Sequence, residues 1–384
     1  MRILVLGGDG YLGWPTSLHF SAQGHEVLAV DNYLRRNLSR NENSECLYEV
    51  PNLNHRAKLW KQRMGKNIHV RIGDLCEWDF ISDVFQKFQP ETVIHYAEQP
   101  SAPYSMKDRS AAALTLYNNL TVTFNVIHAV HEFCPKCHII KLGTMGEYGT
   151  PNIDIEEGWL EINHKGRKDK FLFPRAAGSL YHTTKIHDTD LLWFYVRMWG
   201  LRCTDLMQGP VYGIETYETE GDESLYPFFS YDEIFGTVLN RFLVQAVANY
   251  PLTVYGAGGQ TRGYLDIKDT LQCVYLSSMN PAAEGELRIF NQFVQTFSVN
   301  DLAEKVRVSG ERLGINVKIQ NLPNPRKECE HHYYNPTHQC LLELGLKPHY
   351  LTDDVLDNLM SLIIRYKNKI NKDCIFRKIL WANS

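Results

Sequence analysis

Three glycines near the beginning of the sequence constrain the fold of this chain most strongly. An apolar run of strand length, residues 1–6, precedes Gly7, Gly10 and Gly13, and a helical pattern and a second apolar run follow them. This order is typical of the first βαβ unit of a dinucleotide site. Glycine lets the backbone approach a pyrophosphate, which binds at the N-terminus of the helix. The sequence therefore predicts a dinucleotide-binding turn here.

The second apolar run ends at Asp31, which predicts the identity of the dinucleotide. A carboxylate at this interval binds the hydroxyls of the adenosine ribose. Arg35 and Arg36 follow and can meet a 2′-phosphate, but a carboxylate in this place repels that phosphate. We therefore predict NAD as the cofactor.

Composition and charge favour a soluble enzyme. The 384 residues carry a net charge of −4, which offers no electrostatic reason to expect nucleic acid. No apolar run reaches the ~20 residues of a membrane span. We expect a cytoplasmic location, or the plastid stroma if a transit peptide was removed.

Nine cysteines without a framework spacing favour reduced thiols. Cys134 and Cys137 lack a second pair, so we predict no metal site.

Alternation of strand-length and helix-length segments predicts an α/β fold with a doubly wound parallel sheet. We assign residues 1–206 plus about 234–268 to this Rossmann domain. Residues of about 207–233 plus 269–384, richer in Tyr, Pro and Gly, form a smaller mixed α/β substrate domain. Residues 37–67 and 151–175 are predicted to be long insertions, which are often functional.

Tyr181 and Lys185 form a candidate catalytic pair. Residues four apart lie one helical turn from each other on the same face. The ammonium group is expected to lower the pKa of the phenol from its usual value of about 10. The tyrosinate can then accept a proton from a sugar hydroxyl while hydride leaves the adjacent carbon.

With these motifs the chain resembles the extended short-chain dehydrogenase/reductase family, the NAD-dependent epimerases and dehydratases of nucleotide sugars. The residues that carry the resemblance are Gly7, Gly10, Gly13, Asp31, Gly73-Asp74, His95-Tyr96-Ala97, Asn118-Asn119, Thr144, Tyr181, Lys185, Tyr255-Gly256 and Gln260-Thr261-Arg262. The resemblance implies a homodimer formed through helices that include residues 118–133. It also implies that NAD is bound by Gly7, Gly10, Tyr11, Leu12, Gly13, Asp31, Asn32, Asp74, Leu75, Tyr96, Ala97, Asn118 and Lys185.

Longer strings are similar to one branch of this family, which builds a sulfonated sugar from UDP-glucose. They are residues 98–99, 101–106, 142–158, 259–267, 324–326 and 332–335. The resemblance implies oxidation at C4, loss of the C6 hydroxyl to a 5,6-ene, addition of sulfite at C6 and return of the hydride. The implied substrate-binding residues are Gln99, Tyr104, Thr144, Gln208, Arg241, Tyr255, Arg262 and Arg326.

The segment after Thr144 distinguishes this chain from common relatives. Thr144 itself is expected to hydrogen-bond the C4 oxygen. Dehydratases of the family usually carry Asp-Glu directly after this threonine as acid and base, whereas this chain has Met145 and Gly146. The nearest carboxylate, Glu147, is our candidate for proton transfer at C5 and C6. His182 can instead supply a proton or bind an anion.

One departure affects the use of sulfite. Pro100 stands where the resemblance leads us to expect an arginine, and proline removes both a charge and a backbone donor. Arg109, Arg175 or His182 can replace the lost cation. Alternatively, the enzyme stops at the unsaturated UDP-sugar, uses another nucleophile, or acts as a 4-epimerase. A silent NAD- or sugar-nucleotide-binding regulator is disfavoured by the intact Thr144, Tyr181 and Lys185.

Overall fold

Seven parallel strands form the central sheet of the protein in the computed structural model, which describes residues 1–324 and 332–375. The strand order is β12-β8-β5-β4-β1-β2-β3, which confirms the predicted doubly wound sheet. The carboxyl ends of β1 and β4 lie next to each other, where the strand order reverses. Such a switch point is where ligands bind in open α/β sheets. The strands are β1 (Arg2–Leu6), β2 (Glu26–Asp31), β3 (Ile68–Ile72), β4 (Thr92–His95), β5 (His138–Thr144), β8 (Arg202–Gln208) and β12 (Leu287–Gln292).

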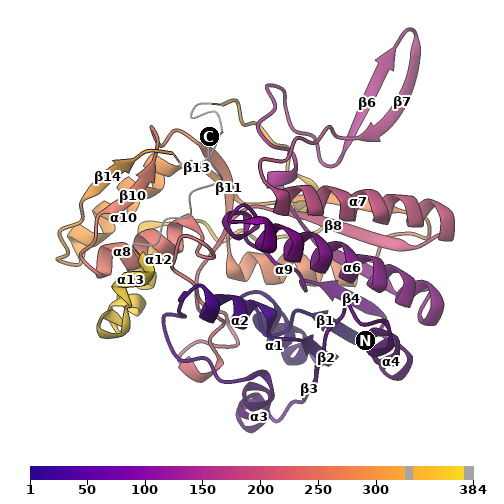
Figure 1. Ribbon diagram of the computed structural model, residues 1–384, viewed down its shortest axis with the longest axis horizontal. Coiled ribbons are helices and arrows are strands. Elements are labelled where there is room, and N and C mark those ends of the chain that lie inside the picture. Colours follow the sequence, from indigo (N-terminus) through magenta and orange to yellow (C-terminus); the bar gives the residue numbers. More distant parts are fainter. Residues whose placement is uncertain (325–331, 376–384) are drawn as a thin grey trace.

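Helices cover both faces of this sheet (Figure 1). One face packs against α4 (Trp78–Phe88), α6 (Arg109–Phe133) and α7 (Leu180–Trp199), and these elements share one hydrophobic core. Side chains from α1 (Gly13–Ala22), α3 (Leu53–Met64), α9 (Ile267–Met279) and α11 (Cys340–Glu343) share the core on the other face. Strands β1 and β2 are buried over most of their length, and they are nearly continuous hydrophobic runs, as expected for strands covered on both faces.

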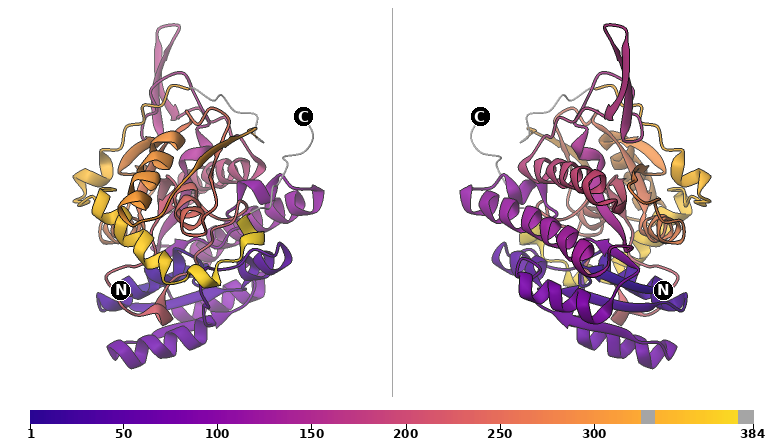
Figure 2. Two further views of the ribbon diagram at one scale, coloured as in Figure 1. Left: turned by 90° about the vertical axis from the view of Figure 1, so that its left-hand side faces the viewer. Right: turned by 90° about the vertical axis from the view of Figure 1, so that its right-hand side faces the viewer.

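A smaller region lies beside the carboxyl ends of the strands and has its own core. Its strands form two small sheets, one pairing β10 with β14 and one with the order β13-β11-β9. Figure 2 shows these elements at the side of the large sheet. They are β9 (Val211–Tyr212), α8 (Val238–Val247), β10 (Leu252–Tyr255), β11 (Thr261–Asp266), β13 (Gln295–Ser298), α10 (Val299–Arg312), β14 (Ile319–Leu322), α12 (Asp353–Ile364) and α13 (Lys372–Ile375).

The predicted division of the chain differs from this arrangement at two places. Residues 234–268 were assigned to the Rossmann domain, but α8 and β10 pack with α10, α12 and β14. Residues 269–384 were assigned to the substrate domain, but α9 covers the large sheet and β12 is its edge strand. The reason is that the chain crosses between the two regions several times, which local patterns do not reveal.

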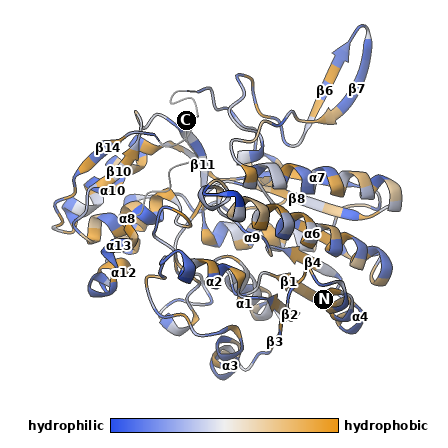
Figure 3. Ribbon diagram, in the orientation of Figure 1, coloured by the Kyte–Doolittle hydropathy of each residue, from blue (hydrophilic) through white to orange (hydrophobic). Residues whose placement is uncertain are grey.

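The two predicted insertions contain regular structure. Residues 37–67 include the end of α2 (Leu34–Asn41) and the whole of α3. Residues 151–175 contain β6 (Trp159–His164) and β7 (Arg167–Leu172), an antiparallel hairpin that projects from the molecule. In Figure 3, β7 is mostly hydrophilic.

Candidate active site

A cavity of about 780 Å³ runs along the carboxyl ends of the strands and reaches the smaller region. Its walls contain twelve of the thirteen residues predicted to bind the cofactor, all except Lys185. They are Gly7, Gly10, Tyr11, Leu12, Gly13, Asp31, Asn32, Asp74, Leu75, Tyr96, Ala97 and Asn118. The fold thus brings together predicted cofactor-binding residues that are far apart along the chain.

The glycine turn is packed so closely that side chains cannot replace two of its glycines. Gly7 has a φ of +83°, and a Cβ added to it lies 2.9 Å from the backbone carbon of Tyr96. A Cβ on Gly13 lies 2.0 Å from the carbonyl oxygen of Gly7. Gly13 begins α1, so the turn and the helix N-terminus form the cradle expected for a pyrophosphate.

Asp31 ends β2 at the edge of this cradle. Its carboxylate accepts hydrogen bonds from the backbone N–H groups of Asp9, at 2.9 Å, and Tyr33, at 2.6 Å. Burial, with a contribution from Asp9, raises the pKa of Asp31 to about 6. When ionised, this carboxylate can accept hydrogen bonds from ribose hydroxyls.

Arg35 and Arg36, which can meet the 2′-phosphate of NADP, both bind other groups of the protein. Arg36 pairs with the carboxylate of Asp9 and donates to the carbonyl oxygen of Val50 at 2.7 Å. Arg35 donates to Ser230 Oγ at 2.6 Å, and its guanidinium lies 3.5 Å from the ring centroid of Phe235. The residues present therefore fit NAD better than NADP.

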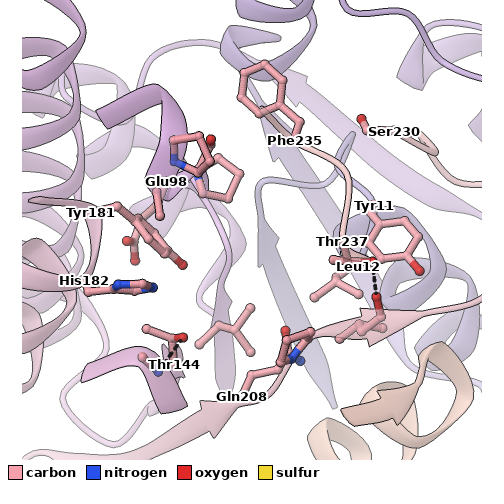
Figure 4. A pocket seen from close by; sticks show the side chains of 18 of the residues that line it. Tyr11, Leu12, Glu98, Thr144, Tyr181, His182, Gln208, Ser230, Phe235 and Thr237 are labelled. Atoms are coloured by element: carbon pink, nitrogen blue, oxygen red, sulfur yellow. Dashed lines mark hydrogen bonds between the residues drawn. The ribbon is translucent and has the colours of Figure 1, made fainter. Parts of the chain in front are cut away.

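The catalytic candidates lie at the other end of the cavity. Thr144 ends β5, and Tyr181 and His182 lie in the first turn of α7, which begins after the N-cap Ser179. Figure 4 shows Thr144, Tyr181, His182 and Glu98 on one side of the cavity, opposite Tyr11, Leu12 and Thr237. Thr144 Oγ accepts a hydrogen bond from the N–H of Gly146 at 3.1 Å, which leaves its own O–H to donate.

Lys185 lies one turn after Tyr181, with its Nζ 6.0 Å from the centroid of the Tyr181 ring. It is buried behind the cavity wall, where it donates to the carbonyl oxygen of Leu142 at 2.6 Å and pairs with Glu98 Oε1 at 2.5 Å. The predicted lowering of the tyrosine pKa is wrong. Burial raises the pKa of Tyr181, and the negative charge of Glu98 adds to the rise.

His182 occupies the space that a side chain at position 146 would need. A Cβ on Gly146 lies 2.4 Å from His182 Nε2. The other ring nitrogen, Nδ1, is 3.0 Å from Ser179 Oγ, which fixes the ring. The glycine thus makes room for an imidazole at the place where dehydratases carry a carboxylate, and Met145, the other departure, also lines the cavity.

Glu147 does not lie where a proton carrier for the substrate is needed. Its side chain is fully buried behind Thr144 and is not among the residues of the cavity wall. The carboxylate lies 3.5 Å from both Lys141 Nζ and Arg175 Nη1, and accepts from the N–H of Thr144 at 3.2 Å. The structure therefore disagrees with our prediction for Glu147, because its partners hold it inside the protein.

Four of the predicted substrate-binding residues besides Thr144 line the cavity: Gln208, Arg241, Tyr255 and Arg262. Gln99 does not, because it is fully buried and bonds to Ser101 and Thr115. Tyr104 does not either, because its ring stacks on Phe235. Arg326 lies outside the described residues.

Pro100 lines the cavity, so the departure from the expected arginine does lie at the site. Among the three cations proposed to replace it, His182 lines the cavity. Arg109 is exposed at the start of α6, and Arg175 is buried beside Glu147.

Other sequence signals lead to no further chemistry. Cys134 and Cys137 are free and buried, and burial raises the pKa of the Cys134 thiol to about 11. Within residues 1–324 and 332–375, no group of His, Cys, Asp or Glu is arranged to hold a metal ion. Over the same ranges, no helix has the length and hydrophobicity that a membrane span requires.

The fold and the site define an NAD-dependent enzyme of nucleotide-sugar metabolism. The profile of the NAD-dependent epimerase/dehydratase family matches residues 3–291, and the chain belongs to this family. Two relatives are similar over nearly all of this chain. UDP-sulfoquinovose synthase of spinach chloroplasts (Spinacia oleracea) is 50% identical over 99% of this chain and 79% of its own length. UDP-sulfoquinovose synthase of Sulfolobus acidocaldarius is 44% identical over 99% of this chain and 98% of its own length.

Solved structures confirm the fold. UDP-glucose 4-epimerase from Stenotrophomonas maltophila, with bound NAD and formylated UDP-arabinopyranose, has a TM-score of 0.73. The comparison covers 97% of this chain and 99% of that protein at 15% identity.

The sequence interpretation missed Glu98 as a site residue. A carboxylate that follows directly after a buried parallel strand lies at the ligand-binding edge of the sheet, and Glu98 follows β4 at this distance. Residues 228 and 233–237 of the cavity wall were also missed, because they belong to an irregular segment before α8.

Proposed function

We propose that this protein converts UDP-glucose and sulfite into UDP-sulfoquinovose. The observation that carries the proposal is the presence of Thr144, Tyr181 and His182 at one end of a cavity whose other end is the NAD cradle. The likeness to two UDP-sulfoquinovose synthases over nearly the whole chain supports this choice of reaction.

The residues of the chain handle the C4 hydroxyl of the sugar first. Thr144 donates a hydrogen bond to the C4 oxygen and orients it, and Tyr181 accepts the hydroxyl proton. NAD, when bound by the glycine turn and Asp31, supplies the acceptor for the C4 hydride and returns the hydride at the end. Because the cofactor is regenerated, the protein is expected to hold it tightly.

His182 is the residue best placed for the second stage. A ketone at C4 acidifies the C5 proton, so a base can remove it while the C6 hydroxyl leaves as water. The imidazole of His182 faces the cavity beside Thr144, in the space left by Gly146. We therefore assign proton transfer at C5 and C6 to His182 instead of Glu147.

The opposite wall provides groups for the UDP moiety. Arg241 and Arg262 carry forked guanidinium groups, which match pairs of phosphate oxygens. Arg262 is held by hydrogen bonds from its Nη1 to the carbonyl oxygen of Thr261, at 2.8 Å, and to His332 Nε2, at 3.0 Å. Gln208 and Tyr255 complete the predicted contacts.

A second candidate function follows from Pro100, which brings no charge to the cavity wall. Without a cation there, the enzyme can stop at the 5,6-unsaturated UDP-sugar. His182 lines the cavity and can bind the sulfite anion, so sulfite addition remains our first proposal.

We also propose a homodimer formed by α6 and α7. These helices pack side by side on one face of the sheet and expose large apolar side chains. The exposed residues are Leu116, Tyr117, Phe124, Phe194 and Met198. Residues 117 and 124 are two turns apart and residues 194 and 198 one turn apart, so each pair lies on one face of its helix.

The test of the function is incubation of the purified protein with UDP-glucose in heavy water, with and without sulfite. Mass spectrometry and NMR follow the products. We expect a sulfonated UDP-sugar in the presence of sulfite. An unsaturated sugar that persists with sulfite present contradicts the proposal and selects the dehydratase, and UDP-galactose selects the epimerase.

Tyr181→Phe is the matched variant for this experiment. It removes the proton acceptor and keeps the ring, so turnover is expected to fall at least ~100-fold, the contribution typical of general acid–base catalysis. Binding of NAD and UDP-glucose, measured by calorimetry, is expected to persist. Unchanged turnover contradicts the assigned role of Tyr181.

A further inference from the structure

A buried carboxylate lies directly beside the Tyr181–Lys185 pair. Glu98 follows β4 and lines the cavity, but its side chain is only 2% exposed. Figure 4 shows its carboxylate next to the ring of Tyr181. A buried carboxylate is expensive unless a cation compensates for it, and here Lys185 Nζ lies 2.5 Å from Glu98 Oε1.

This ion pair occupies part of the hydrogen-bonding capacity of Lys185. An ammonium group has three N–H donors. One is directed at the carbonyl oxygen of Leu142, at 2.6 Å, and a second at Glu98. A third donor is left for a bound cofactor, while the positive charge that acts on Tyr181 is already offset.

Three cations and three carboxylates pair in the buried cluster around Tyr181. Lys141, Arg175 and Lys185 face Glu98, Glu147 and Asp205. Asp188 is also buried here, and burial, together with the charge of Glu98, raises the pKa of its carboxyl group well above the usual value. His95 is also buried in this cluster, 3.7 Å from Glu98, and burial lowers its pKa, so it is neutral. His182 faces Tyr181 from the cavity side.

We propose that Glu98 is a positioning residue that acts through Lys185: it offsets the ammonium charge, so that Tyr181 keeps its proton until a cofactor's cationic ring and a substrate hydroxyl are both present. The role of Tyr181 as the base rests on the proposed function. The consequence is that a tyrosinate is not formed in an incomplete site. In agreement, burial raises the pKa of Tyr181, and Glu98 makes the next largest contribution.

The test compares the wild-type protein with Glu98→Gln, which removes the charge and keeps the shape. Tyrosinate formation by Tyr181 is measured as the ultraviolet difference between each protein and the same protein carrying Tyr181→Phe, with and without NAD. The expected result is a midpoint at least one pH unit lower in Glu98→Gln, because Lys185 then acts on the phenol without compensation. An unchanged midpoint overturns the proposal.

The pH profile of the first turnover gives a second readout. After UDP-glucose is added to the NAD-loaded protein, the acid limb of C4 oxidation is expected to move to lower pH by a similar amount in Glu98→Gln. The titration of Tyr181 needs no turnover, so a failure of the proposed function does not obscure it. A shift in neither readout assigns Glu98 a purely structural role.

Two variants separate the charge effect from a general effect of removing a buried acid. Asp205→Asn removes a fully buried carboxylate that pairs with Lys141 at 3.3 Å, not with Lys185, and is expected to leave the Tyr181 midpoint nearly unchanged. The double variant Glu98→Gln/Lys185→Gln removes both charges, avoids an unpaired buried cation if the single variant folds poorly, and is expected to restore the wild-type midpoint. A midpoint lowered equally in all three variants contradicts the proposal.

Discussion

At the residue scale, Gly146 and His182 depend on each other because they share one volume. A methyl group at position 146 lies 2.4 Å from His182 Nε2 and must displace the imidazole. We predict that Gly146→Ala reduces formation of the sulfonated product at least ~100-fold, the scale of general acid–base catalysis. Oxidation at C4, seen as NADH absorbance, is expected to persist because Thr144 and Tyr181 remain in place.

Gly178→Ala is the matched control for this variant. Gly178 also lines the cavity near His182, but a Cβ added there meets no atom within 4 Å. Product formation in Gly178→Ala is expected to stay within about threefold of the wild type, because the added methyl group displaces no neighbouring atom and its cost stays near about 0.5 kcal/mol. Equal losses in the two variants contradict the steric pairing of Gly146 with His182.

Also at the residue scale, Asp31 makes NAD binding dependent on pH. Burial raises the pKa of Asp31 to about 6, so the carboxyl group holds a proton below this pH. Binding to ribose hydroxyls requires the ionised form, so NAD affinity is expected to fall up to tenfold per unit as the pH drops below about 6. Calorimetric titration of nucleotide-free protein with NAD, between about pH 5 and pH 8, checks this prediction. The same slope in Asp31→Asn excludes Asp31 as its source.

At the element scale, the sequence predicted the elements whose own residues carry the signal. Residues 1–13 and 26–31 combine apolar strands, glycines and an acid at fixed spacing, and they form the β1–α1–β2 unit as expected. By contrast, β12 carries Arg288, Asn291 and Gln292 among its six residues, so its sequence does not reveal a buried strand of the large sheet.

The same limit applies to the candidate site. Thr144 and Tyr181 were predicted because each belongs to a motif, and both line one cavity together with His182. Glu98 and Glu147 were misjudged because a carboxylate's role depends on which way it points. Their directions are set by Lys185, Lys141 and Arg175, which reach them from other parts of the chain.

The projecting hairpin is a further element whose energetics can be predicted. Its base is anchored because Trp159 packs on Trp193 with 4.9 Å between ring centroids, whereas the residues of its tip are exposed. An isolated two-stranded hairpin is only marginally stable. Replacing residues 161–170 with an Asn-Gly turn is therefore expected to change the melting temperature by less than about 2 °C.

Differential scanning calorimetry checks this prediction, with Trp159→Ala as the comparison. That substitution removes a half-buried ring from the edge of the main core and is expected to lower the melting temperature by more than the deletion does. A larger loss in the deletion variant shows that the tip packs against the protein body.

At the scale of the whole molecule, the exposed apolar side chains of α6 and α7 indicate a contact with a second copy of the chain. Tyr117 is 64% exposed and Met198 62% exposed, on helices that otherwise bury their opposite faces against the sheet. Large apolar patches on a protein surface mark interaction sites, and a twofold dimer uses the same patch on both subunits. A stable interface of this kind buries about 800 Å² on each partner.

Tyr117→Glu/Met198→Glu places charges in this surface, where pairing with a second copy would bury them without partners. We therefore predict that the wild-type protein sediments at twice the chain mass in analytical ultracentrifugation, and that the double variant sediments at the chain mass with an unchanged circular dichroism spectrum. Tyr350→Glu is the control, since Tyr350 is 55% exposed but lies outside α6 and α7, and this variant is expected to remain dimeric. Because α7 also carries Tyr181, His182 and Lys185, turnover of the monomeric variant is expected to fall if the dimer holds this helix in place. NAD affinity is expected to fall less, since the glycine turn between β1 and α1 lies outside the proposed interface. A double variant that remains dimeric excludes this surface as the interface.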